Sequence, residues 1–112
     1  MQRRLIVLTG AMLGALLLGG GVIAATAGND ATVTIDNFTF APAQITVAHG
    51  TKVTWSNRDD IPHTVTDAGQ PRAFKSAALD TGDKFSFVFA SPGTYHYFCS
   101  LHPHMQGTVV VQ

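Results

Sequence analysis

After residue 30 the chain alternates apolar and polar residues in short segments, and this pattern constrains its fold more than any other feature. Val33 and Ile35 share one face of a segment whose other face carries threonines, and Phe85, Phe87 and Phe89 occupy alternate positions. A period of two residues is typical of half-buried β-strands, and no segment after residue 30 shows a helical period. The expected strands lie at residues 31–38, 45–47, 51–55, 63–66, 85–89, 95–99 and 107–111. Short strands separated by turn residues predict an all-β sandwich or a small barrel.

The N-terminal segment has a different composition. Arg3 and Arg4 are followed by an uncharged, largely apolar run that lasts until residue 29 and includes the sequence Ala25-Thr26-Ala27. A basic start, an apolar stretch and an A-x-A site predict a secretory signal peptide over residues 1–27, which leaves one domain at residues 28–112. An uncleaved membrane anchor is the alternative, because about 20 apolar residues suffice to span a bilayer. The arginine pair also permits twin-arginine export.

Charge and cysteine content exclude several functions. Seven Lys and Arg balance seven acidic residues, so the chain has no basic surface for nucleic acid. All seven acids are aspartates, which excludes a glutamate base. A single cysteine cannot form an internal disulfide or a zinc site with several thiolates. Since a small exported domain usually needs disulfides or a metal for stability, we expect a metal.

The segment from Cys99 to Met105 carries the chemistry of a metal site. It combines a thiolate, the imidazole of His102 and a thioether at the end of a predicted strand. These soft and borderline donors favour copper over magnesium, calcium or manganese. A blue copper site takes two histidines, one cysteine and a distant methionine, so a second histidine must come from elsewhere. His63 is the best candidate, because it follows a charged loop at the start of a predicted strand.

The sequence resembles the cupredoxin family, most closely its amicyanin-like and pseudoazurin-like members. The spacing C-x2-H-x2-M from Cys99 to Met105 is similar to the short ligand loop of amicyanins. The resemblance covers essentially the whole predicted domain. It runs through Phe38, Phe40, Pro42, Ile45, Val47, Gly50, Val53, Trp55, Asn57, His63, Gly93, Thr94, Tyr95, Tyr97 and Cys99.

The resemblance implies a Greek-key β-sandwich of about seven to eight strands with one type 1 copper ion. It implies copper ligation by His63, Cys99, His102 and Met105. His104 competes with His102, since the two lie only two residues apart. We assign His102 as the ligand and His104 to the surface, because both cannot face one metal without distorting the loop.

Residues next to the ligands are expected to orient them. Asn57 could tie the two loops together, and the hydroxyl of Ser100 is expected to bridge to Thr64. The family usually has asparagine at the position of Thr64, so threonine is a departure, and the Thr64 N–H is expected to donate to the Cys99 sulfur. The family also commonly has proline at the position of Leu101. Leucine restores an N–H there, which suggests a second N–H···S hydrogen bond.

The favoured function is electron transport by a periplasmic or otherwise extracytoplasmic protein, with one copper ion cycling between Cu(II) and Cu(I). Partners are expected to be redox proteins, such as an amine dehydrogenase or a cytochrome, that dock transiently around His102. Contact with a membrane is expected only if residues 1–27 are retained. The alternative is a copper-binding or copper-delivery module. An enzyme is not expected, because a closed set of four ligands leaves no open position for substrate.

Overall fold

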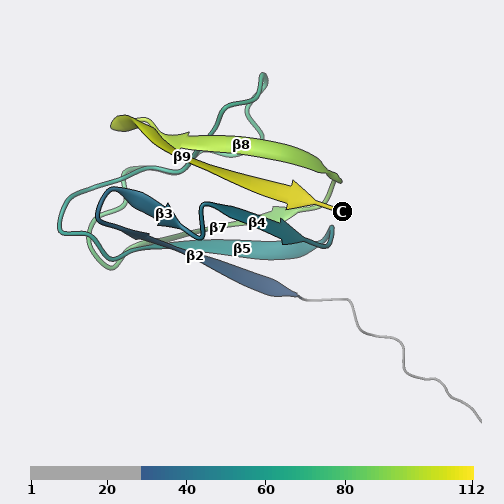
Figure 1. The fold of residues 1–112 in the computed structure, drawn as a ribbon, viewed down its shortest axis with the longest axis horizontal. Helices are drawn as coiled ribbons and strands as arrows, with labels where there is room; N and C mark the ends of the chain where they lie inside the picture. Colours follow the sequence, from purple (N-terminus) through teal and green to yellow (C-terminus); the bar gives the residue numbers. More distant parts are fainter. Residues whose placement is uncertain (1–28) are drawn as a thin grey trace, which may run out of the picture.

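The computed structural model describes residues 29–112, which form two four-stranded sheets packed face to face (Figure 1). The strands are β2 (Asp30–Asp36), β3 (Thr39–Ala41), β4 (Gln44–Val47), β5 (Thr51–Asn57), β6 (Thr66–Asp67), β7 (Lys84–Phe89), β8 (Gly93–Cys99) and β9 (His102–Val111). One sheet has the order β3-β2-β5-β7 and the other β4-β9-β8-β6. The predicted all-β sandwich of seven to eight strands is therefore confirmed. The predicted signal segment, residues 1–27, lies outside the described residues.

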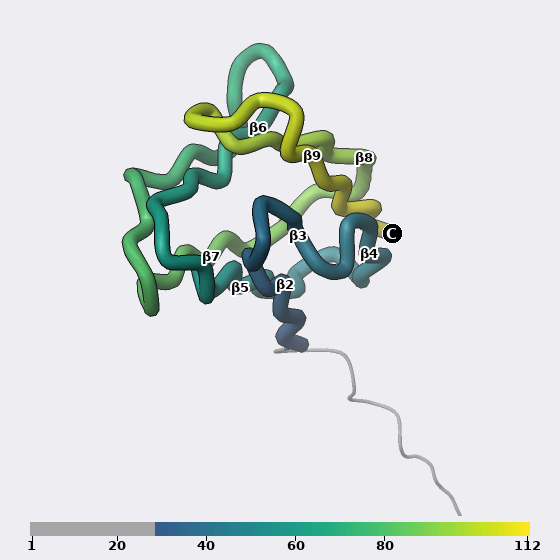
Figure 2. Tube along the Cα trace, turned by 60° about the vertical axis from the view of Figure 1, so that its left-hand side comes forward, coloured from purple at the N-terminus to yellow at the C-terminus, as the bar shows by residue number. Residues whose placement is uncertain are grey.

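The core lies between the two sheets. Figure 2 shows β8 and β9 on one side of the sandwich and β2, β5 and β7 on the other. The edge strands of the two sheets, β3 and β4, lie next to each other in this view. Alternate residues of each strand enter the core, as Val33 and Ile35 of β2 and Trp55 of β5 do. Trp55 and Tyr97 meet edge to face with ring centroids 5.3 Å apart, so the two sheets interlock through aromatic side chains. No helix within this part of the chain is long and apolar enough to cross a membrane.

Strand directions bring several loops to one end of the sandwich. We call the end at which β2 and β5 finish and β7 begins the site pole. β2 and β5 are parallel, and β7 is antiparallel to β5. The C-terminal ends of β2 and β5 and the N-terminal end of β7 therefore lie at the same pole. A two-residue turn at this pole, Asn37–Phe38, joins β2 to β3, and both residues have positive φ angles, 51° and 56°. Such angles match the primed turns that suit the twist of a hairpin.

The last strand is longer than predicted. The alternation predicted a strand at residues 107–111, whereas β9 begins at His102 and pairs with β8 at His102 and again from Gln106 to Val111. Pro103 lacks an amide donor, and proline is tolerated in a strand mainly where one side is unpaired. That condition is met because β4 pairs only with Thr108 to Val111 of β9.

The segment predicted as a strand at residues 63–66 also differs. Only Thr66–Asp67 forms a strand, β6, while His63 makes an isolated bridge to Leu79. All four residues from His63 to Thr66 are buried, so the segment has no solvent-facing side. It is fixed by backbone hydrogen bonds between His63 and Leu79 and between Val65 and Ser76.

Gly107 is required by close packing between β8 and β9. It lies opposite Tyr97 in the ladder, and a Cβ atom at this position would overlap the tyrosine ring. The absence of a side chain lets the Tyr97 ring lie over the backbone of β9 and reach Trp55 in the core.

Candidate metal centre

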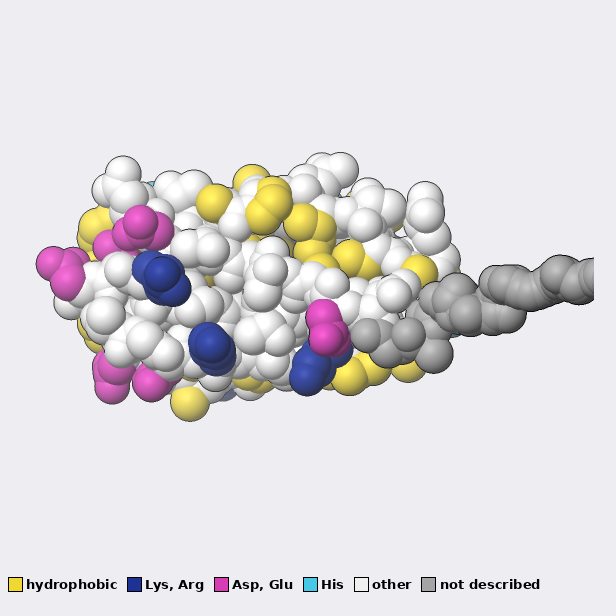
Figure 3. Space-filling view, turned by 90° about the horizontal axis from the view of Figure 1, so that it is seen from below, with side chains coloured by type: hydrophobic (Ala, Val, Ile, Leu, Met, Phe, Trp, Pro, Cys, Tyr) yellow, Lys and Arg dark blue, Asp and Glu magenta, His cyan; other side chains and the backbone are white. Residues whose placement is uncertain are grey.

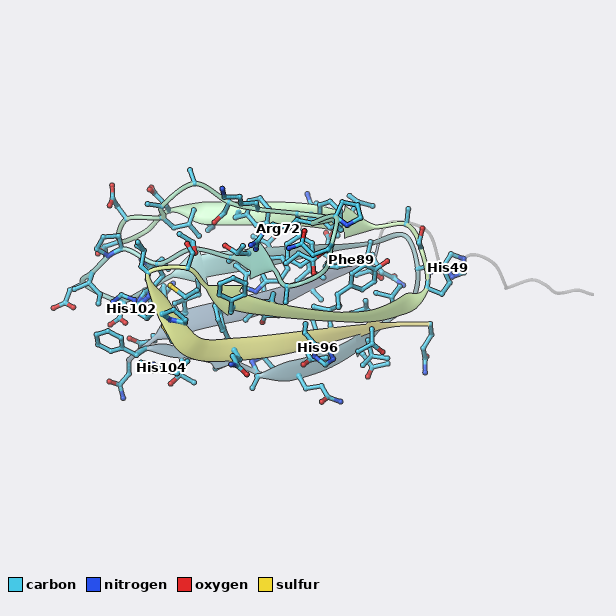
Figure 4. All side chains as sticks on the ribbon, turned by 90° about the horizontal axis from the view of Figure 1, so that it is seen from above. His49, Arg72, Phe89, His96, His102 and His104 are labelled. Carbon is cyan, nitrogen blue, oxygen red and sulfur yellow. The ribbon has the colours of Figure 1, made fainter. Side chains whose placement is uncertain are left out.

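A tight turn between β8 and β9 brings Cys99 and His102 together. Cys99 is the partner of His102 in the ladder, and Ser100 and Leu101 form the turn between them. The register shifts at Phe98 and Cys99, an irregularity that re-aims the side chains at the end of the strand. Cys99 Sγ lies 3.7 Å from Nδ1 of His102. Cys99 is fully buried, whereas His102 is half-buried at the end of the molecule that also carries His104 (Figure 4).

His63 reaches the same point from a different part of the chain. Its ring is completely buried, and its Nδ1 lies 3.7 Å from Cys99 Sγ. The ligand atoms of His63, Cys99 and His102 all lie within 4.8 Å of one another. Two imidazole nitrogens and one thiol sulfur therefore converge on one small volume. The structure brings together three of the four ligands predicted from the sequence.

Met105, the fourth predicted ligand, is buried in the interior of β9. It is 3% exposed and belongs to the same apolar cluster as Cys99. Inward-facing residues alternate along this part of β9, so Met105 and Gly107 point to the core while His104 and Gln106 point to solvent. His104 therefore has the surface position predicted for it.

Asp59 holds His63 in place, a role that was not predicted from the sequence. Its Oδ2 lies 2.8 Å from His63 Nε2 and also accepts the Phe38 N–H at 3.0 Å. The hydrogen bond from the Phe38 amide, assisted by that from His63, lowers the pKa of Asp59 below its usual value. The ionised carboxylate accepts a hydrogen bond from Nε2–H, so Nδ1 of the neutral His63 ring presents a lone pair toward Cys99. The signal available in the sequence is the Asp-x3-His spacing.

Phe38 is a second residue of the site whose role was not predicted from the sequence. Its ring meets His63 and His102 edge to face, with centroid distances of 5.5 Å and 5.0 Å. Phe38 is nevertheless 49% exposed. The ring therefore covers both histidines from the solvent side, at the tip of the β2–β3 turn.

Hydroxyl groups join the two ligand-bearing segments, as the sequence predicted. The Thr64 N–H donates to Cys99 Sγ at 3.3 Å. The Thr64 hydroxyl lies 2.8 Å from the Ser100 hydroxyl and accepts the Ser100 N–H at 2.7 Å. The same hydroxyl lies 3.2 Å from that of Thr66. Threonine thus connects the segments although it is shorter than the asparagine usual in the resembling family.

Two expectations about neighbouring residues are corrected. Asn57 donates to the carbonyls of Ile61 and Leu79 and accepts the Asp59 N–H, so it fixes the His63 side and does not reach the Cys99 turn. Leu101 forms no N–H···S bond to Cys99 within the described residues. Its amide is central in a two-residue turn and has no partner in the ladder, and its side chain is 50% exposed.

Comparisons with known proteins agree with this geometry. The profile of the cupredoxin-like domain matches residues 9–111. The chain belongs to the cupredoxin family. It is 34% identical over 83 residues to amicyanin-alpha of Methylorubrum extorquens, covering 71% of this chain and 70% of that protein. It is 33% identical over 84 residues to a plastocyanin of Scenedesmus fuscus, covering 65% and 86%. The solved structure of a purple cupredoxin from Nitrosopumilus maritimus covers 73% of this chain and 99% of its own, with 34% identity and a TM-score of 0.69.

The donor set fits the single type 1 copper ion of a cupredoxin. A thiol sulfur and two imidazole nitrogens are the equatorial donors of such a site. The Thr64 amide stabilises negative charge on the sulfur, as a thiolate ligand requires. Copper is thus the cofactor of this cupredoxin, and the protein is not an enzyme. Its family and its site are those of a blue copper electron carrier.

Proposed function

We propose that this chain is an exported blue copper protein that carries single electrons between redox partners, with His63, Cys99, His102 and Met105 as copper ligands. The observation that carries the proposal is the convergence of two Nδ1 atoms and one Sγ within 4.8 Å. One of the two histidines, His102, is half-exposed. Copper, when bound, supplies the Cu(II)/Cu(I) couple. The residues around it hold its ligands and connect them with the surface.

The arrangement suits electron transfer better than catalysis. His63 and Cys99 are fully buried and hydrogen-bonded to fixed groups, so two ligands have little freedom to move between redox states. His102 is half-buried at the surface, so its outer ring edge offers the shortest route for an electron. With Met105 as the fourth ligand, no coordination position stays open for substrate.

Met105 is proposed as the fourth and weakest ligand. Its position three residues after His102 and its burial in the same cluster as Cys99 support this role. Its thioether would tune the reduction potential and contribute little to holding the metal. Replacement by glutamine or leucine is therefore expected to shift the potential and leave copper bound.

The partners are proposed from the relatives, and export is proposed from the N-terminal sequence. Amicyanin and plastocyanin are among the relatives of this chain. We propose transient docking around His102 to a redox protein such as an amine dehydrogenase or a cytochrome. Export is proposed from the apolar segment at residues 1–27 with its A-x-A site.

Visible spectroscopy of the purified protein with added Cu(II) tests the function. We expect an intense blue absorption band that Cys99→Ser abolishes, His102→Ala changes strongly and His104→Ala leaves unchanged. The control for electron transport is reduction by ascorbate in the presence of a Cu(I) chelator. A carrier retains copper and regains its colour on reoxidation, whereas a copper-delivery protein loses the metal. A colourless copper complex would refute the blue copper assignment.

A further inference from the structure

Most sides of the metal centre are closed by buried groups. His63 and Cys99 are fully buried, and Met105 is 3% exposed. Thr64, also buried, joins the two segments that carry His63 and Cys99 through hydrogen bonds of its hydroxyl group. His102 is the predicted ligand that reaches the surface, so the approach from solvent to the metal centre lies on its side.

The ring of Phe38 and the turn at Ser100 and Leu101 flank this approach. The turn is fastened, because the two ligands on either side of it pair in the ladder between β8 and β9, and because the Ser100 N–H donates to Thr64. The Phe38 ring lies edge to face against both histidines and is 49% exposed. Swinging this ring outward breaks no hydrogen bond, whereas opening the turn breaks those of Ser100.

The backbone of Phe38 is anchored independently of its ring. Its N–H donates to Oδ2 of Asp59 at 3.0 Å, and the same oxygen accepts the hydrogen bond from His63 Nε2 at 2.8 Å. The base of the turn is therefore attached to the group that fixes His63. Rotation of the ring about its side-chain bonds leaves this attachment intact, as a cover on a fixed hinge requires.

The turn geometry does not favour an aromatic residue at position 38. Asn37 and Phe38 have φ angles of 51° and 56°, and two-residue turns of this kind prefer asparagine followed by glycine. Phe38 thus occupies the position of the glycine, where a bulky side chain costs free energy. The ring is kept against the preference of its backbone, which indicates that its contact with the two histidines has a function.

We infer that Phe38 is the movable cover of the metal centre. While its ring lies against the two histidines it blocks access to Cys99, and a copper ion enters or leaves when the ring swings outward. This inference rests on the proposed copper ligands and adds the route by which the metal reaches them. Phe38 donates nothing to the metal, so its removal should change the rates of access and leave the donor set intact.

Alkylation of Cys99 in the metal-free protein tests the cover without copper. Cys99 is the one cysteine of the chain, so its reaction with iodoacetamide, followed by mass spectrometry, reports on access to the site. Iodoacetamide is small and uncharged, which matters because Figure 3 shows acidic side chains gathered at the site pole, where an anionic reagent would be repelled. A buried thiol reacts only from the open state, so the rate measures how often the cover opens.

Phe38→Gly removes the ring and the backbone strain together. We expect Cys99 to react about tenfold faster in this variant than in the parent, because the open state becomes the resting state. Phe38→Tyr keeps an aromatic ring and should react at the parent rate. Leu101→Ala, which shortens the other half-exposed apolar side chain beside His102, is the matched control, and its rate should stay within about twofold of the parent.

Urea unfolding of the same metal-free variants separates a cover from a packing residue. Glycine relieves the positive φ angle, so the unfolding midpoint of Phe38→Gly should not decrease in proportion to the gain in reactivity. Phe38→Asn, which also accepts this angle, should give the same gain in reactivity as Phe38→Gly. Faster alkylation that follows the loss of stability across the variants would show opening by unfolding and would overturn the cover.

Stopped-flow mixing of the metal-free protein with Cu(II) connects the cover with the metal. The blue band should form faster in Phe38→Gly and reach the same final spectrum as in the parent. A protein that turns blue, but whose alkylation and copper uptake are the same in Phe38→Gly and the parent, refutes the cover and leaves the electron-carrier function standing. Acceleration in Leu101→Ala alone would place the opening at the turn and also refute the cover. Accelerated alkylation of Phe38→Gly without a blue complex in any variant would refute the electron carrier and retain the cover.

Discussion

The two histidines of the site lie in opposite surroundings. His63 is fully buried, its Nε2 bonds to Asp59, and its backbone is bridged to Leu79. His102 is half-exposed, and its ring contacts Cys99, His63 and the exposed Phe38. The inner side of the site is thus built into the core, whereas the outer side is attached to a two-residue turn.

This difference separates two requirements of an electron carrier. Ligands must keep their positions when the metal changes charge, and one ligand must remain close to a partner. Fixed second-sphere contacts such as that of Asp59 serve the first requirement. An exposed ring on a short turn serves the second. Each side of the site can therefore be perturbed separately, and the effects should differ in kind as well as in size.

The largest difference is expected for removal of the two imidazoles. His63→Ala leaves a cavity in the core and deprives Asp59 of its partner, so it should lower the free energy of unfolding of the metal-free protein by about 3 kcal/mol. His102→Ala removes a half-exposed ring and should cost less than about 1 kcal/mol. Urea unfolding of both variants without metal measures this. Equal costs would show that burial does not distinguish the two sides.

The buried, inner side of the molecule also makes the free energy of unfolding decrease at alkaline pH. Burial raises the pKa of Tyr97, which lies in the core two residues before Cys99, to about 12. Since the unfolded tyrosine ionises near pH 10, the unfolded state loses its proton first as pH rises. The contribution of Tyr97 to the free energy of unfolding is complete below pH 10. It is lost by about pH 12, which lowers that free energy by about 2 kcal/mol. Urea unfolding of the metal-free protein at pH 9.5 and pH 11.5 should show a smaller decrease in Tyr97→Phe.

Asp59→Asn tests whether the carboxylate fixes and polarises His63. Loss of such a partner typically lowers metal affinity by about 10- to 100-fold. A neutral amide makes His63 a weaker donor, which disfavours Cu(II), so the reduction potential should rise by tens of millivolts, on a scale of about 59 mV per tenfold. Copper titration and voltammetry measure the two effects. Asp60→Asn, the exposed neighbour, is the control, and a similar change in both variants would contradict a specific role of Asp59.

The sequence predicted the parts of this molecule that depend on local patterns. Alternation identified strands such as β2 and β7, and the spacing from Cys99 to Met105 identified the outer side of the site. Asp59 and Phe38 were not connected with the site, because their contacts depend on the pairing of β2 with β5 and on the turn between β2 and β3. The extension of β9 to His102 was missed because proline at residue 103 is unfavourable in a strand unless one side is unpaired.

The smallest effect is expected for Leu101→Pro on the outer side. A second N–H···S bond at Leu101 would withdraw charge from the sulfur and raise the potential, and proline would then lower it by roughly 40 mV for a bond of about 1 kcal/mol. In the described residues the hydrogen bond to Cys99 Sγ from a backbone amide comes from Thr64, on the inner side. The Leu101 amide belongs to a turn and has no partner for proline to remove. We therefore expect the potential of Leu101→Pro to stay within about 10 mV of the parent value, on the same scale. Voltammetry of the variant with its blue band intact is the measurement. A decrease of several tens of millivolts would show that the amide of Leu101, in the outer turn, also donates a hydrogen bond to the sulfur. Cys99 would then be held from both sides of the site, which would contradict the distinction between an inner and an outer side.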